Sequence, residues 1–294
     1  MLKEFKGIYP YIVSPIDENG EVMTEVLTDL VNHLIDSGVH GIAPLGSTGE
    51  FFYLTWDQKK KIVETVVKAA NHRVPVLAGV SASTVREAVE QAREFKEMGV
   101  DGLIGILTVY FPLSQESIYN YYKGLAESVD LPICLYNNPH FSGFELKNET
   151  LVRLSKIENI KYYKDASSNT GRLFSVINEV KDDLKVFSAS AHIPAFVMQL
   201  GGVGWMSGPA CLIPKESVRL FELCEAKKWD EAMELQRKIW TFNDAFQKYN
   251  LAACVKAGLE LQGFKVGKPI PPTAALSDQD IADIKKVLET VKEI

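Results

Sequence analysis

The sequence predicts an α/β fold in which parallel strands close into a (β/α)8 barrel with a C-terminal helical extension. Short apolar segments alternate with longer amphipathic ones, and successive apolar segments mostly start about 25 to 35 residues apart, the length of a strand–helix unit. Eight apolar segments precede a final stretch in which only helix-like patterns occur. Eight units in one chain of 294 residues favour a closed barrel over an open sheet.

The expected strands are rich in Ile, Val, Leu and Gly, and several are apolar without alternation, as strands covered on both faces are. They span residues 7–13, 41–45, 74–79, 102–107, 132–136, 160–164, 184–188 and 202–207. An open doubly wound sheet would normally carry a Gly-x-Gly-x-x-Gly turn after its first strand. The first strand here ends in Val13-Ser14-Pro15-Ile16, which holds no glycine, so the barrel is the better prediction.

The expected helices place apolar residues three or four positions apart. Between the strands they span residues 24–36, 55–69, 83–98, 114–128 and 146–155. Thr55 and Gln58 form a capping-box pattern before an apolar face, which marks a helix start. After about Leu212 the strand patterns stop, and helices are expected at residues 221–226, 229–246, 251–262 and 278–292. We therefore expect a catalytic barrel at 1–223 and a helical extension at 224–294.

Composition and charge narrow the class of protein. The chain is 46% hydrophobic and 24% charged, as soluble globular proteins are, and its net charge of −6 argues against nucleic acid or a membrane surface as a partner. No apolar stretch is long enough to span a membrane, and the N-terminus carries no apolar signal segment, so we expect a cytoplasmic protein. The four cysteines form no Cys-x-x-Cys pair and are expected to be reduced, with no metal site.

Lys164 is the first candidate for chemistry because it ends an apolar segment. In a barrel of this kind the active site forms at the carboxyl ends of the strands. Desolvation among apolar neighbours lowers the pKa of a lysine, and a free amine attacks a ketone. The pattern predicts imine formation with a 2-oxo acid, although a single lysine is more often a solvated surface residue.

Tyr136 ends the preceding expected strand, in Leu131-Pro132-Ile133-Cys134-Leu135-Tyr136-Asn137. A phenol at that edge of the sheet can carry protons to and from a carbinolamine. The alternative is a core aromatic residue whose hydroxyl bonds a backbone group.

A turn of small residues, Gly46-Ser47-Thr48-Gly49-Glu50, follows the second expected strand. Its two glycines allow a tight turn with exposed N–H groups, and the hydroxyls of Ser47 and Thr48 add donors, so Gly46, Ser47 and Thr48 suit a carboxylate. The alternative is an ordinary strand–helix turn in which a hydroxyl caps the next helix. The amine, the phenol and the turn together are more specific than any one of them.

With these features the chain resembles the family of dihydrodipicolinate synthase and N-acetylneuraminate lyase, class I aldolases on a (β/α)8 barrel. The similarity covers nearly the whole chain and includes Tyr136-Asn137-Asn138-Pro139 and Lys256-Ala257-Gly258-Leu259 besides the turn at 46–50. The resemblance implies no metal and no organic cofactor, and a homotetramer built as a dimer of dimers.

The resemblance also implies a role for each candidate residue. Lys164 would be the Schiff-base lysine and Tyr136 the proton shuttle. Ser47 and Thr48 would hold the carboxylate of the 2-oxo acid. Thr48 would also join a proton relay with a tyrosine after the fourth expected strand, where Tyr110 stands.

Three departures from the family pattern bear on the substrate. Phe141 stands where dihydrodipicolinate synthase has an arginine that grips the carboxylate of the second substrate. The loop after the fourth strand has Tyr110-Phe111 where the synthase has two tyrosines. Ala189-Ser190-Ala191-His192 stands where the family has a Gly-x-Asp type turn. His192 would either touch a substrate hydroxyl or carboxylate or face the solvent.

The expected reaction is therefore pyruvate-dependent aldol cleavage or condensation with an aldehyde, of the kind that N-acetylneuraminate lyase or 2-keto-3-deoxygluconate aldolase performs on a sugar acid. A first alternative keeps the imine but eliminates water or ammonia, as the sugar-acid dehydratases and hydroxyproline-pathway deaminases of the family do. Dihydrodipicolinate synthase itself is a second alternative. A barrel that binds a 2-oxo acid without turnover is a third, which an intact amine, phenol and turn disfavour.

Overall fold

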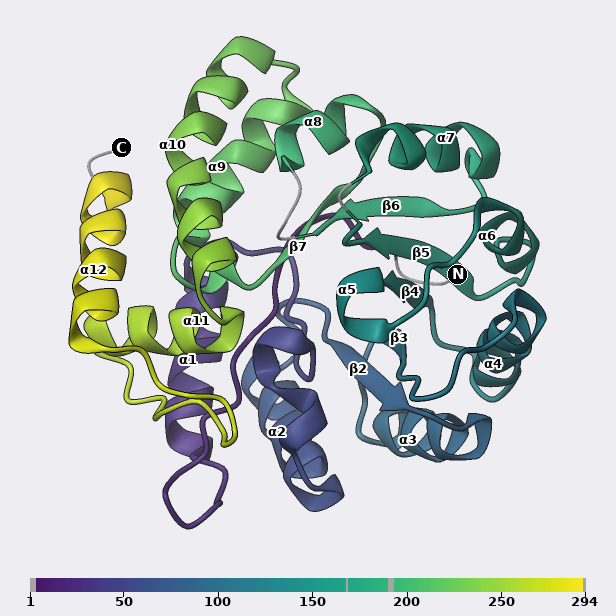
Figure 1. Cartoon of the computed structure of the whole chain (residues 1–294), viewed down its shortest axis with the longest axis horizontal. Coiled ribbons are helices and arrows are strands. Elements are labelled where there is room, and N and C mark those ends of the chain that lie inside the picture. Colours follow the sequence, from purple (N-terminus) through teal and green to yellow (C-terminus); the bar gives the residue numbers. More distant parts are fainter. Residues whose placement is uncertain (1–3, 168, 190–192, 293–294) are drawn as a thin grey trace.

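In the computed structural model, parallel strands form a curled sheet at the centre of the molecule, and helices surround it (Figure 1). The structure describes residues 4–167, 169–189 and 193–292. The seven strands are hydrogen-bonded in the order β1-β7-β6-β5-β4-β3-β2, and every pair is parallel. They are β1 (Gly7–Pro10), β2 (Leu77–Ala82), β3 (Gly102–Leu107), β4 (Ile133–Asn137), β5 (Ile160–Asp165), β6 (Lys185–Ser188) and β7 (Gly204–Ser207). The predicted (β/α)8 barrel is confirmed.

The segment expected as a strand at 41–45 closes the barrel through isolated bridges and not through a ladder, so this expectation was wrong in detail. Parallel bridges join Ala43 to Tyr11 and Ile42 to Val76. Pro44 has no N–H to donate, and Leu45 has a φ of 61° in the left-handed region, so regular pairing ends there. β1 and β2 are the two edge strands of the sheet, and these bridges connect the two edges and so close the barrel.

Helices follow the strands around the outside of the sheet. They are α1 (Thr24–Asp36), α2 (Trp56–Ala70), α3 (Val85–Glu97), α4 (Gln115–Glu127), α5 (Pro139–Ser142), α6 (Asn148–Leu154), α7 (Thr170–Val180), α8 (Pro194–Gln199), α9 (Pro214–Glu225), α10 (Trp229–Lys248), α11 (Leu251–Leu261) and α12 (Asp278–Lys292). The capping box at Thr55 and Gln58 is present at the start of α2. The boundary proposed at 223/224 falls inside α9 near its end.

The inside of the barrel is filled by side chains, so it is not a channel. One buried cluster lies within the sheet and holds Phe5, Tyr9, Tyr11, Ala43, Leu77, Ile104, Ile106, Cys134, Tyr136, Tyr162, Phe187 and Met206. A larger apolar cluster lies between the sheet and the helices. A ligand can therefore enter only above the filled core, at the carboxyl ends of the strands.

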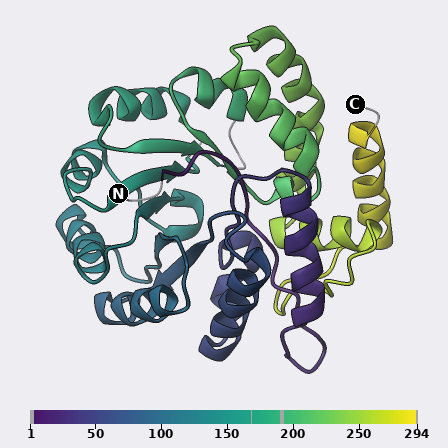
Figure 2. The same cartoon turned by 180° about the vertical axis from the view of Figure 1, so that it is seen from behind.

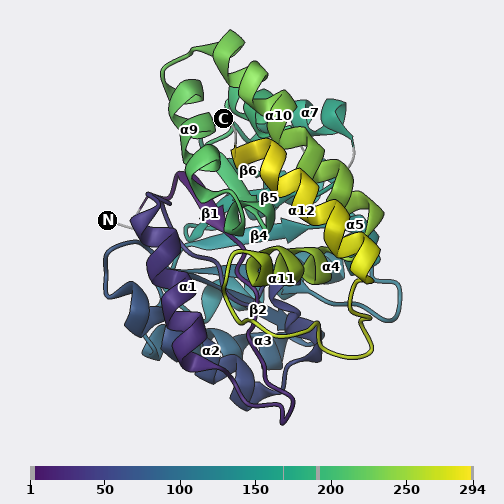
Figure 3. The same cartoon turned by 90° about the vertical axis from the view of Figure 1, so that its left-hand side faces the viewer.

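The C-terminal helices α10, α11 and α12 lie together on one side of the barrel, where α12 packs on α10 and α11 (Figures 2 and 3). A buried ion pair joins α11 to the turn at 46–50. Lys256 Nζ of α11 lies 2.6 Å from Glu50 Oε2. Lys256 also donates to the Lys268 carbonyl at 2.9 Å, and the Ile270 amide donates to Glu50 Oε1 at 2.7 Å. The extension and the turn thus share one polar cluster.

None of the helices in the described part of the chain combines the length and the apolar character that a membrane span requires.

Lys256→Met should lower the free energy of unfolding by about 3–5 kcal/mol, because Glu50 would stay buried without its counter-charge. Urea unfolding measures the effect. Lys265→Met is the matched control: Lys265 pairs with Glu260 at 3.7 Å but is 76% exposed, so its loss should cost no more than about 1 kcal/mol. Equal effects of the two substitutions would show that the buried pair does not anchor the extension.

Candidate active site

Lys164 lies one residue before the end of β5 and is paired in register with Tyr136 of β4. Its side chain is 3% exposed. The amine nitrogen lies 3.5 Å from the ring centroid of Tyr11 and 5.0 Å from that of Tyr136. The structure thus places the predicted amine and the predicted phenol side by side above the filled barrel.

Burial lowers the pKa of the Lys164 amine to about 7, and the nearby Cys134 thiol acts weakly in the opposite direction. The ordinary pKa of a lysine is about 10.4, at which the neutral form is scarce at neutral pH. Near pH 7 about half of the Lys164 side chains are therefore free amines, the form that attacks a carbonyl carbon.

The Tyr136 hydroxyl is held by two polar neighbours. It lies 3.0 Å from the Ser47 hydroxyl, and Asn138 Nδ2 donates to it at 2.8 Å. Burial raises the pKa of this phenol, while the bonds to Ser47 and Asn138 oppose the rise. The phenol is protonated at neutral pH, and its proton can pass toward Ser47 or a ligand.

The turn at 46–50 forms a short 3-10 helix, Ser47–Gly49. The amides of Gly49 and Glu50 donate within the turn, to the carbonyls of Gly46 and Ser47. The tight winding therefore uses two of the N–H groups that the sequence led us to expect as exposed donors. The Thr48 hydroxyl, in contrast, is buried and has no hydrogen-bond partner among the described residues, which leaves it for a polar group of a ligand.

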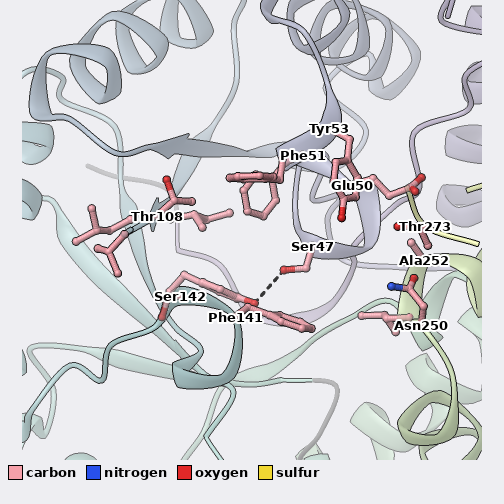
Figure 4. A pocket seen from close by; sticks show the side chains of 16 residues that line it. Ser47, Glu50, Phe51, Tyr53, Thr108, Phe141, Ser142, Asn250, Ala252 and Thr273 are labelled. Carbon is pink, nitrogen blue, oxygen red and sulfur yellow. Dashed lines mark hydrogen bonds between the residues drawn. The ribbon is translucent and has the colours of Figure 1, made fainter. Parts of the chain in front are cut away.

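A cavity of about 380 Å³ opens beside these groups, and Figure 4 shows its lining. Ser47 and Tyr136 form part of the wall, joined by their hydrogen bond. The other lining residues are Glu50, Phe51, Phe52, Tyr53, Ile106, Leu107, Thr108, Val109, Phe141, Ser142, Asn250, Leu251, Ala252 and Thr273. Neither Lys164 nor Thr48 is among the lining residues, and the amine lies behind the wall, 5.0 Å from the ring centroid of Tyr136.

The other residues predicted from the sequence are Phe141, Tyr110 and His192. Phe141, in α5, lines the cavity and is 62% exposed. Tyr110 is 91% exposed, and its ring meets Phe111 edge-on with centroids 5.0 Å apart. The expected relay from Thr48 to Tyr110 is not formed within the described part of this single chain, because the loop carries Tyr110 outward. His192 lies outside the described residues.

A buried polar network behind the strand ends was missed by sequence reasoning. Asp165 is fully buried and accepts bonds from Asn137 Nδ2 at 2.9 Å and from Arg172 Nη1 at 3.1 Å. Asn137 follows Tyr136, and Asp165 follows Lys164, so the network joins the ends of β4 and β5 from the outer face. The only signal in the sequence is a charged residue beside the lysine, which does not reveal its partners.

Two further contributions to the site also come from residues far away in the sequence. Asn250 and Thr273 of the C-terminal extension line the cavity. Tyr11, beyond the end of β1, lies under the amine. Alternation from Tyr9 could have placed Tyr11 inside the barrel, but not beside Lys164.

Within the described residues no group of three or more His, Cys, Asp or Glu side chains is arranged to hold a metal ion. All four cysteines are free and buried, as expected.

The comparisons with known proteins agree with each other. The model of the dihydrodipicolinate synthetase family matches residues 4–291. A 4-hydroxy-tetrahydrodipicolinate synthase of Desulfotalea psychrophila is 32% identical over 290 residues, covering 98% of this chain and 97% of that protein. A second one, from Oceanobacillus iheyensis, is 31% identical over 284 residues and covers 97% and 96%.

Solved structures give the same result. A putative dihydrodipicolinate synthetase of Pseudomonas aeruginosa superposes with a TM-score of 0.95 at 27% identity, covering 98% of this chain and all of that one. The chloride-inhibited dihydrodipicolinate synthase of Acinetobacter baumannii, in complex with pyruvate, gives a TM-score of 0.93 at 29% identity and covers 98% and 99%.

Modification of Lys164 by a small 2-oxo acid and borohydride should depend on pH with a midpoint near 7. The rate should fall about tenfold for each unit well below that midpoint, because the ammonium form cannot attack. Mass mapping of the labelled peptide measures the rate. Lys161, at the other end of β5, should stay unmodified, and labelling of both lysines with one pH dependence would contradict a special environment at Lys164.

Proposed function

The chain belongs to the dihydrodipicolinate synthetase family, and from this premise we propose that it is a lyase that forms an imine between Lys164 and a 2-oxo acid. One observation carries the proposal: a buried amine whose pKa is lowered to about 7 lies beside a buried phenol at the open end of the barrel. A protein that only bound the acid would need neither group. No cofactor enters the proposed reaction.

The proposed roles follow from the contacts. The Lys164 amine attacks the carbonyl carbon, and Tyr136 supplies a proton as the carbinolamine loses water. The hydroxyls of Thr48 and Ser47 bind the carboxylate, since the Thr48 hydroxyl has no partner among the described residues and the Ser47 hydroxyl is bonded to Tyr136. Loss of a proton from the adjacent carbon then gives an enamine, which adds to an aldehyde.

We propose pyruvate as the 2-oxo acid, because the similar protein of Acinetobacter baumannii was solved in complex with it. The names of the relatives favour the synthesis of 4-hydroxy-tetrahydrodipicolinate as the reaction with the second substrate. From the sequence alone this reaction is only an alternative. That product is a dicarboxylate, so the aldehyde must carry a carboxylate of its own. This reaction is the first candidate.

The lining of the cavity favours a second candidate, in which the aldehyde comes from a sugar acid and presents hydroxyls to this wall. Neither lysine nor arginine is among the 16 described residues that line it. Glu50 is its one charged member, and that carboxylate is paired with Lys256. Phe141 stands at the position of the family's carboxylate-binding arginine and offers an apolar ring, which cannot pair with an anion. Dehydration or deamination of a sugar acid would use the same imine.

Exposed aromatic side chains support the proposal of a homotetramer. Phe52, Tyr110 and Phe111 are 72%, 91% and 74% exposed in the single chain. Large apolar side chains exposed at a surface mark an interaction site, and a second copy would cover them. We also propose a cytoplasmic location, in line with the free cysteines.

Incubation with pyruvate and borohydride should add one reduced pyruvate to the intact protein, located at Lys164. Lys164→Ala should abolish the adduct, whereas Lys161→Ala should keep it, because the latter residue lies at the far end of the strand. Intact mass and peptide mapping measure both. Absence of an adduct from the folded wild-type protein with pyruvate and longer 2-oxo acids would overturn the proposed function in favour of a binding protein.

Phe141→Arg should raise kcat/KM by about tenfold for an aldehyde that carries a carboxylate, since a charge-assisted hydrogen bond is gained at the cavity wall. The same change should lower turnover of a sugar-acid aldehyde. Pyruvate consumption or release, measured with both kinds of aldehyde, distinguishes the two candidates. Phe52→Arg, which adds the same charge at another lining position, is the control.

If the wild-type protein already uses the carboxylate-bearing aldehyde efficiently and Phe141→Arg changes nothing, the synthase reaction stands and the sugar-acid candidate fails.

A further inference from the structure

Tyr11 lies in an unusual position under the nitrogen of Lys164. The ring centroid is 3.5 Å from Nζ, closer than the 5.0 Å that separates Nζ from the Tyr136 ring. Tyr11 is 1% exposed and belongs to the cluster inside the barrel. Its position is set by the backbone bond from its amide to the Ser207 carbonyl at 3.0 Å.

The turn that is proposed to bind the carboxylate packs against the same ring. A Cβ on Gly46 would lie 2.7 Å from Tyr11 Cδ2, so only glycine fits this close approach. Tyr11 therefore touches both halves of the site, the amine of Lys164 and the first residue of the turn.

The amine has no carboxylate facing it among the described residues. The titratable side chains next to it are Cys134 and Tyr136 of β4 and Tyr11 itself, and burial raises the pKa of each, so all three are neutral at pH 7. Asp165 follows Lys164 on the strand but points to the outer face, where it binds Arg172. A positive charge on Nζ must be stabilised by something other than a protein carboxylate.

We propose that Tyr11 is a further catalytic residue, whose ring face stabilises the positive charge on Lys164 Nζ when the imine forms. The proposal rests on the proposed function and deepens it. The electron-rich face of a tyrosine attracts a cation within about 6 Å, and most strongly where water is excluded. Both conditions are met at 3.5 Å in this buried site.

The step balances as follows. A C–N bond forms between Nζ and the carbonyl carbon, and the C–O bond of the carbinolamine breaks. Water leaves with the carbonyl oxygen, one proton from the amine and one proton from Tyr136. The product is a protonated imine whose charge is shared between nitrogen and carbon, directly above the Tyr11 ring. Tyr136 is left as a phenolate, which regains a proton when the carbon next to the iminium is deprotonated to give the enamine; until then this phenolate and the carboxylate of the 2-oxo acid are the anions near the charge.

Tyr11→Leu should raise the pyruvate concentration for half-maximal borohydride trapping about tenfold, because the iminium loses the ring. The acid limb of the trapping rate should also move to lower pH by about one unit, since the ring stabilises the ammonium as well. A purely structural loss would not combine weaker imine formation with a more acidic amine. Tyr11→Phe keeps the ring and should stay within about twofold of the wild-type protein.

Tyr9→Leu is the matched control, because Tyr9 is another aromatic residue of the barrel interior and packs on Phe187 with centroids 5.5 Å apart. It should reduce stability and leave both trapping parameters unchanged. If Tyr11→Leu traps like the wild type, if Tyr11→Phe loses as much as Tyr11→Leu, or if Tyr9→Leu reproduces the effect, the proposal is overturned.

Pentafluorophenylalanine introduced at position 11 nearly keeps the shape of the ring and removes its negative face, so it tests the proposal should Tyr11→Leu fail to fold. It should behave as predicted for Tyr11→Leu, and trapping equal to that of Tyr11→Phe would overturn the role of the ring. The two proposals fail separately. No adduct in the wild-type protein removes the proposed function, whereas an adduct that is insensitive to the ring removes only the role of Tyr11.

Discussion

The parallel pairing of β4 with β5 is the constraint on which the site depends, because it sets Tyr136 opposite Lys164. Each residue is close to the carboxyl end of its strand and points into the closed barrel, so a slip of either strand by one residue would turn its side chain to the outer face and separate the pair. The network of Asp165, Asn137 and Arg172 joins the two strand ends on that outer face. The register of the sheet and the reactivity of the amine are therefore fixed by the same local structure.

Burial of a lysine is unfavourable when it is charged, and the barrel avoids most of this cost by keeping the amine partly neutral. A facing carboxylate would hold the lysine as an ammonium and remove its nucleophilicity. An aromatic ring is a compromise, since it stabilises a cation more weakly than a carboxylate does. Tyr11 under Lys164 meets this requirement, and the paired Asp165 on the other side of the strand does not disturb it.

Much of the fold could be predicted because it depends on local patterns. The expected helices at 24–36 and 278–292 match α1 and α12, and apolar segments located β2 to β7. The expected second strand is not regular, because Pro44 lacks an N–H and Leu45 has a left-handed backbone conformation. An apolar composition does not indicate either effect. Lys164, Tyr136 and the turn at 46–50 could be proposed as site residues because each stands at or just after the end of an expected strand. Tyr11 and the Asp165 network were missed because their roles depend on neighbours that are distant in the sequence.

The C-terminal extension is part of the site and not only an addition to the barrel. Asn250 and Thr273 form part of the cavity wall, and α11 contacts the 3-10 turn that carries Ser47 and Thr48. Glu50 ends that turn in the left-handed region with a φ of 55°, a conformation that a non-glycine residue adopts only when its surroundings hold it. The ion pair with Lys256 and the hydrogen bond from the Ile270 amide fix the Glu50 carboxylate and so stabilise this conformation. Because the turn presents the Thr48 hydroxyl, the geometry of the proposed carboxylate site depends on helices that follow the last strand of the barrel.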